Sequence, residues 1–231
     1  MLDLTTTIPG PLAADVEEIV VAAARRHREH PYHRAFADGT LPPVVYAHFA
    51  RQDSYHLLPD YGRAFARCAA RAAEPTHARF LSRMAAICLD SVASDMRTIG
   101  DTLRGLGLSP EQADGAPPVA PATRSYTYFL TAAGVTSLAA GLGALLPSAL
   151  LQMRINDHLL AHYTAGSRYA ALIEQSHPGE EYRRLVDELL VLVNEVGAGA
   201  STGERAELLR FVAEAVRHEW AFLEAAWRLQ T

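Results

Sequence analysis

Two acidic residues lie within apolar helical stretches, where a carboxylate is costly to bury. Asp53 belongs to ARQDSYHLLPDYGRAFARCAARA, residues 50–72, at the edge of an apolar stripe. Glu219 belongs to VRHEWAFLEAAW, next to Trp220, and shares an apolar face with Phe222. For Glu219, a place among bulky apolar groups predicts a raised pKa, which suits general acid or base catalysis. The alternative is that both side chains point to water and have no role.

Other polar residues lie where a helical core must accommodate them. His56 follows Asp53 by one helical turn, so the two share a face. Tyr126 opens an apolar helix in RSYTYFL, and a buried tyrosine usually finds a hydrogen-bond partner. Ser148 and Gln152 lie on one face of LLPSALLQMRIND, which is otherwise rich in Leu, Ala and Met. Core packing, or a place at the rim of the core, is the alternative explanation for each.

Ten histidines raise the question of a metal site. His158 and His162 have a spacing that suits a metal on a helix, and His27, His30 and His33 are clustered. Neither an HExxH motif nor the recurring Glu-x-x-His pair of a di-iron bundle is present. We therefore predict no metal and no cofactor.

The composition is that of a globular protein with a sizeable core. The chain has 231 residues, 49% of them hydrophobic, which predicts one domain. A formal charge of −5 and the absence of a basic run argue against a nucleic-acid partner. Cys68 and Cys88 are too few for a disulfide framework, so free thiols in a reducing cytoplasm are expected. The N-terminus shows no signal peptide.

The most apolar region, residues 129–151, is not expected to span a membrane. Glycines and Pro147 interrupt it, and the polar residues from Gln152 onward follow it directly. A buried pair of helices explains this pattern better.

Helical periodicity covers nearly the whole chain. The segment HPYHRAFADGTLP is expected to be a connector, and SPEQADGAPPVAPATRS a loop. Ser201 or Thr202 is the expected N-cap of the last helix. Without strand signals, the prediction is a single-domain, all-α helical bundle, with helices at residues 12–29, 42–73 (bent near Pro59), 76–106, 122–142, 147–164, 167–176, 180–196 and 203–229.

Several motifs along the chain together resemble those of the TenA (thiaminase II-like) family. The first is HPYHRAFADGTLPPVVYAHFARQDSYHL, and it is followed in the family's order by PATRSYTYFL, GALLPSALL and HEWAFLEAAW. The resemblance spans about residues 30–227. It implies a haem-oxygenase-like helical fold, used without haem, for a single TenA-like domain over residues 1–231. It also implies a homo-oligomer, a tetramer or dimer.

The resemblance assigns roles to individual residues. Asp53 matches the aspartate that holds an aminopyrimidine, and a carboxylate fits the paired donors of that ring. Tyr126 matches a pocket tyrosine, and Glu219 matches the catalytic glutamate that moves protons.

The chain departs from the family at the nucleophile. Ser148 replaces the cysteine that follows Leu-Leu-Pro, and a serine needs an adjacent base to attack. His56 and Gln152 stand where the family has tyrosines.

Three hypotheses follow for the function. The first is a cytoplasmic hydrolase of C–N bonds, resembling an aminopyrimidine aminohydrolase. It would act on an aminopyrimidine or an amino- or formamido-heterocycle in thiamine salvage, without a cysteine. Its catalytic residues would be Glu219 and Asp53, and its substrate-binding residues Tyr126, His56, Ser148 and Gln152. The second is a ligand-binding or regulatory protein without turnover. The third is a metal-dependent oxygenase using histidines.

Overall fold

The computed structural model describes residues 12–230, and these form two compact units. The first unit comprises Met1–Thr40 and Leu142–Val216, and the second comprises Leu41–Gly141 and Arg217–Thr231. The prediction of no signal peptide concerns residues that lie outside the described ones. The prediction of a single domain stays a prediction.

The described residues are helical almost throughout and contain no strand, which confirms the predicted all-α class. One short segment, η1, is a π-helical turn. The elements are α1 (Ala13–Glu29), α2 (Pro31–Asp38), α3 (Pro43–Gln52), η1 (Asp53–Leu57), α4 (Leu58–Arg71), α5 (Pro75–Gly105), α6 (Pro110–Ala113), α7 (Pro121–Thr136), α8 (Leu138–His162), α9 (Ala170–Ser176), α10 (Gly179–Gly199) and α11 (Thr202–Trp227).

In the first unit, the segment expected to be a connector is a helix, α2. His30 caps it, because its Nδ1 accepts the backbone N–H of Tyr32 at 3.1 Å. Pro31 takes the first helical position, where no N–H is needed. Gly39, with φ of 86°, ends the helix in the left-handed region. These signals outweigh the shortness of the helix, so the prediction of a connector was wrong for residues 31–38, while residues 39–42 are non-helical as predicted.

The start of α11, also in the first unit, is capped as the sequence indicates. The Glu204 N–H donates to Ser201 Oγ at 3.3 Å, and Glu204 Oε2 accepts the Ser201 N–H at 2.8 Å. This reciprocal pair is a capping box, and it identifies Ser201 as the N-cap.

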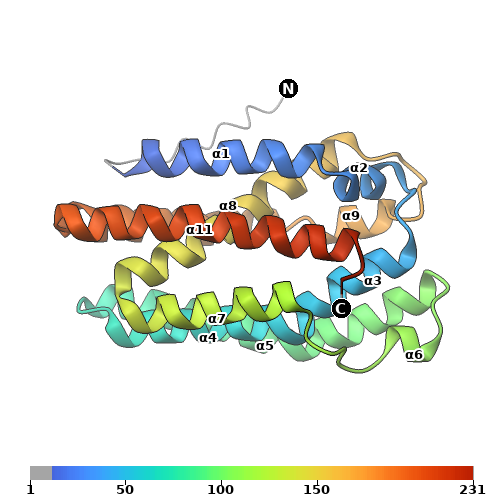
Figure 1. Ribbon diagram of the computed structural model, residues 1–231, viewed down its shortest axis with the longest axis horizontal. Coiled ribbons are helices and arrows are strands. Elements are labelled where there is room, and N and C mark those ends of the chain that lie inside the picture. Colours follow the sequence, from blue (N-terminus) through green and yellow to red (C-terminus); the bar gives the residue numbers. More distant parts are fainter. Residues whose placement is uncertain (1–11, 231) are drawn as a thin grey trace. The chain divides into compact units, whose positions relative to one another are not determined.

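In the second unit, α4 packs against both α5 and α7, as Figure 1 shows. The long helix expected from residue 42 to 73 is interrupted by η1, directly before Pro59 at the start of α4. A proline cannot donate to the carbonyl four residues earlier, and its ring crowds that carbonyl. The wider π turn accommodates this defect, so the irregularity predicted near Pro59 takes the form of a π turn.

The apolar region is a pair of helices, as expected, but the break lies at Ser137 rather than before Pro147. Ser137 is extended and its Oγ accepts the N–H of Ala140 at 2.9 Å, while Pro147 lies inside α8. Among the described residues, α8 alone is long and apolar enough to cross a membrane, but 83% of its most apolar window is buried. That burial is typical of a core helix.

Glycines in this region permit close packing rather than interrupting a helix. In the second unit, a Cβ added at Gly141 would overlap the Sγ atom of Cys68. Gly141 is therefore required by the contact between the start of α8 and α4, and not by an unusual backbone angle.

We predict that Gly141→Ala lowers the free energy of unfolding by about 1–3 kcal/mol, because the added methyl overpacks a buried contact. Urea denaturation would measure this loss. The double variant Gly141→Ala with Cys68→Ala should recover part of it, because the opposing sulfur is removed.

Gly105→Ala is the matched control, since nothing lies within 4 Å of a Cβ at that helical position. It should be neutral or slightly stabilising. Equal losses for Gly141→Ala and Gly105→Ala would contradict this explanation.

Candidate active site in the second unit

Asp53 is the first residue of the π turn η1, between α3 and α4. Single π turns often mark functional sites, because they change the direction of one side chain within a helix. Asp53 is partly buried, and burial raises the pKa of its carboxyl to about 7. The charges of Glu219 and Asp95 contribute to this rise, after burial. Asp53 is therefore close to half ionised at neutral pH.

Glu219 is held by a short hydrogen bond from α7. The hydroxyl of Tyr126 donates to Glu219 Oε1 at 2.6 Å, and the tyrosine side chain is completely buried. A hydrogen bond to a carboxylate is stronger than one between neutral groups, so it fixes the carboxylate orientation. The same carboxylate is near enough to Asp53 to act on its pKa. The structure thus brings Asp53, Tyr126 and Glu219 together.

Aromatic rings surround this group within the second unit. His218 stacks on Tyr126 with ring centroids 5.3 Å apart and packs against Phe129 at 4.6 Å. Phe49 and Phe222 meet edge to face at 5.2 Å. Partial burial among apolar rings lowers the local dielectric constant and strengthens the interaction between the carboxylate charges.

Side chains on both sides of Asp53 hold a segment that we call the strap, residues 114–120, which joins α6 to α7. Gln52 is buried, donates to the carbonyl of Pro118 at 2.8 Å and accepts the N–H of Ala120 at 3.1 Å. His56 Nε2 lies 2.8 Å from the carbonyl oxygen of Pro117. A carbonyl only accepts, so this nitrogen carries a proton. In the structure, His56 therefore hydrogen-bonds to the strap from η1.

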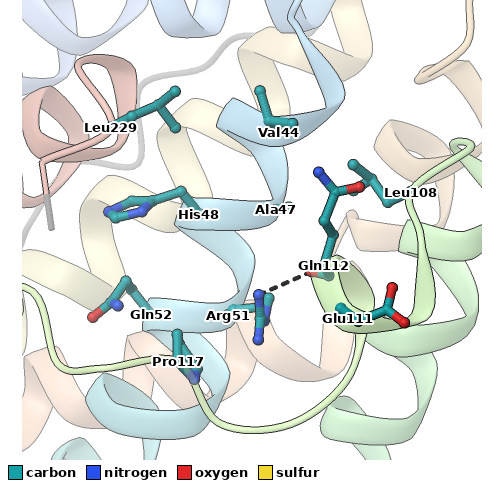
Figure 2. Close-up of a pocket in the computed structure, with 10 residues that line it drawn as sticks. All are labelled: Val44, Ala47, His48, Arg51, Gln52, Leu108, Glu111, Gln112, Pro117 and Leu229. Carbon is teal, nitrogen blue, oxygen red and sulfur yellow. Dashed lines mark hydrogen bonds between the residues drawn. The ribbon is translucent and has the colours of Figure 1, made fainter.

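Arg51 holds the other end of the same segment. Its guanidinium donates to the carbonyls of Gln112, Asp114 and Gly115, each at 2.9 Å. Figure 2 shows the side chain directed at Gln112, beside an open pocket of about 280 Å³. None of the six predicted site residues lines this pocket. The lining residues are Val44, Ala47, His48, Arg51, Gln52, Leu108, Glu111, Gln112, Pro117 and Leu229.

Asp95 is a third acidic residue at the site, and the sequence analysis missed it. It is partly buried on α5, which packs against η1, and burial raises the pKa of its carboxyl. The sequence indicates only that a short turn separates the helices expected at residues 42–73 and 76–106, so that they pair antiparallel. In such an antiparallel pair, the contact of Gly62 with Leu89 places Asp95 toward the η1 end.

Ser148 and Gln152 lie in the first unit, on α8. Ser148 is partly buried. Gln152 is exposed, and its Oε1 accepts the hydroxyl of Tyr182 at 3.0 Å. Their predicted place in one site with Asp53 stays a prediction.

The histidine groups do not form a metal cluster in the part of the chain that the structure describes. No three or more His, Cys, Asp or Glu side chains within residues 12–230 are arranged to hold an ion. His162 Nδ1 lies 2.8 Å from the carbonyl oxygen of His158, and His33 Nδ1 lies 2.7 Å from that of His27. These contacts direct one nitrogen of His162 and one of His33 to the backbone.

Comparison with known proteins identifies the family of this chain. Residues 17–229 match the model of the TENA/THI-4/PQQC family. An aminopyrimidine aminohydrolase from Halalkalibacterium halodurans is 26% identical over 200 residues, which cover 86% of this chain and 87% of that protein. The solved TenA homologue from P. horikoshii OT3 has a TM-score of 0.72 and 24% identity, with 94% of this chain and 96% of that chain covered.

A domain of unknown function with a heme oxygenase-like fold, from Shewanella denitrificans, has a TM-score of 0.65 and 12% identity. It covers 94% of this chain and 92% of its own. The protein is thus an all-α protein with the haem-oxygenase-like fold. It belongs to the TENA/THI-4/PQQC family, as its sequence motifs predict.

The raised pKa of Asp53 predicts that this residue destabilises the folded state above neutral pH. The unfolded carboxyl ionises near 3.8 and the folded one near 7, so the folded state binds more protons between these values. Stability from this group therefore falls as the pH rises through that window. Asp53→Asn should raise the free energy of unfolding at pH 8 by about 1–2 kcal/mol, with a smaller gain at pH 5.

Chemical denaturation at the two pH values measures this effect. The exposed Asp90 on α5 supplies the control Asp90→Asn, which should change stability equally at both. A gain for Asp53→Asn that does not depend on pH would contradict the assignment.

Proposed function

We propose that the protein is a hydrolase of C–N bonds that acts on an aminopyrimidine, or a related amino- or formamido-heterocycle, without a cysteine nucleophile. The observation that carries this proposal is the Tyr126–Glu219 hydrogen bond beside a carboxyl group, Asp53, whose pKa is near neutrality. The similarity to an aminopyrimidine aminohydrolase supports the substrate class. A role in thiamine salvage belongs to the same proposal.

The two carboxylates divide the work in this mechanism. Ionised Asp53 accepts hydrogen bonds from an exocyclic amino group and a ring N–H, which fixes the heterocycle. Glu219 takes a proton from water as the water oxygen bonds to the carbon that carries the leaving nitrogen. The C–N bond then breaks, and the nitrogen leaves with that proton as ammonia or an amine. Tyr126 keeps the Glu219 carboxylate oriented through both steps.

The cysteines support a mechanism in which water attacks directly. Cys68 and Cys88 are free and buried, and burial raises the pKa of their thiols to about 12 and about 11. Only a thiolate is an effective nucleophile, so neither sulfur is suited to attack at neutral pH.

The proposal also includes the other predicted substrate-binding residues, the cellular compartment and the oligomeric state. His56 contributes by holding the strap, and Ser148 and Gln152 remain candidates for substrate contacts. The protein is proposed to act in the cytoplasm as a homo-oligomer, a tetramer or dimer, without a nucleic-acid, membrane or cofactor requirement.

Glu219→Gln should lower kcat by about 10²- to 10⁴-fold with little change in KM, because it removes the group that moves protons. Release of ammonia or formate from a panel of amino- and formylamino-pyrimidines measures this. Glu224→Gln is the matched control on α11, because Glu224 pairs with Arg228 instead. An unchanged rate for Glu219→Gln, or no product from the wild-type protein, would refute the proposal.

The pH profile tests the role of Asp53 separately. If binding needs ionised Asp53, kcat/KM should rise about tenfold from pH 6 to pH 8, because ionisation of a group with a pKa near 7 falls in that range. Asp53→Asn should lose this rise and increase KM. A wild-type profile that is flat between pH 6 and 8 would exclude Asp53 as the titrating anchor.

A further inference from the structure

His218 directly precedes Glu219 on α11, and its ring lies against Tyr126. The two ring planes are 10° from parallel, with centroids 5.3 Å apart. Phe129 packs beside this pair, with its ring centroid 4.6 Å from that of His218 and 6.3 Å from that of Tyr126. Three rings from two helices therefore form one cluster within the second unit, in which His218 and Tyr126 are stacked and Phe129 is tilted.

Tyr126 is consequently held at two points by successive residues of α11. His218 contacts the face of the phenol ring, and Glu219 accepts its hydroxyl at 2.6 Å. Successive side chains on a helix diverge by about 100°, so they reach different parts of the same tyrosine. A phenol ring that lost its stacking partner could turn or shift, and a short hydrogen bond is sensitive to both distance and angle.

We propose that His218 is a positioning residue for the reaction. By stacking on Tyr126 it keeps the phenol hydroxyl on Glu219, and this bond keeps the carboxylate directed at the substrate. The effect of His218 on turnover rests on the proposed function. The stacking on Tyr126 and the Tyr126–Glu219 hydrogen bond do not, because both are present in the protein without substrate. His218 thus acts through Tyr126.

A double-mutant cycle tests this path. An aromatic pair contributes about 0.5–1.5 kcal/mol, so His218→Ala should lower kcat about two- to tenfold with KM nearly unchanged. His218→Phe retains a flat ring and should restore most of the rate. In a Tyr126→Phe background, which lacks the hydroxyl, His218→Ala should cause no further loss.

The contrary results are equally specific. Independent losses for His218→Ala and Tyr126→Phe, which multiply in the double variant, would overturn the proposal. So would a rate for His218→Phe as low as that for His218→Ala, provided that both proteins show cooperative thermal unfolding.

A second measurement needs no turnover. The hydroxyl proton of Tyr126, assigned by its disappearance in Tyr126→Phe, should give a downfield NMR signal protected by the bond to Glu219. It should be retained in His218→Phe and be weakened or lost to exchange in His218→Ala. An unchanged signal in His218→Ala would refute the positioning role, even if no substrate is turned over. Inactive wild-type protein with the expected NMR result would refute the proposed function alone.

Discussion

The candidate site in the second unit depends on the cost of holding Asp53 near Glu219 in a partly buried place. Two carboxylates that share a site repel one another and lose hydration, and both effects favour the protonated form. Burial is the larger cause for Asp53, and the charge of Glu219 comes second. The fold retains this unfavourable pair, and the hydroxyl of Tyr126 partly compensates it by donating to Glu219. Unfavourable groups of this kind are concentrated at sites that bind or react.

The position of Asp53 is linked to that of Tyr126 through the strap. Gln52 and His56 flank Asp53 in sequence and both bond to strap backbone, just before α7 begins. The π turn sets the direction of the Asp53 side chain. The strap fixes where α7 starts, and α7 carries Tyr126. The same short stretch of chain thus supplies one carboxylate and helps to place the partner of the other.

The sequence predicted the helices well because helical periodicity is strong over long apolar stretches. It also singled out Asp53 and Glu219, whose apolar neighbours predicted the burial that raises the pKa of Asp53. It missed α2 because a short helix depends on its caps rather than on periodicity. It placed the break in the apolar region at Pro147, although a proline is tolerated inside a helix when the packing around it is favourable.

Tertiary features were harder to predict. Asp95 lies on a helix with many exposed polar residues, and only its packing against η1 distinguishes it. The contacts of Gln52 and His56 with the strap join residues far apart in the sequence, so no local sequence pattern predicts them. Gly141 looked like a helix interruption, and only the contact with Cys68 shows that it provides space.

The most direct test of this account is a carboxyl-carbon NMR titration of Asp53 in protein labelled at aspartate and glutamate. The account predicts a midpoint near pH 7 in the wild-type protein, and a clear decrease when Glu219 is replaced by Gln. A midpoint near 4 in both proteins would show that the two carboxylates neither share a buried site nor influence one another, and it would contradict the central claim.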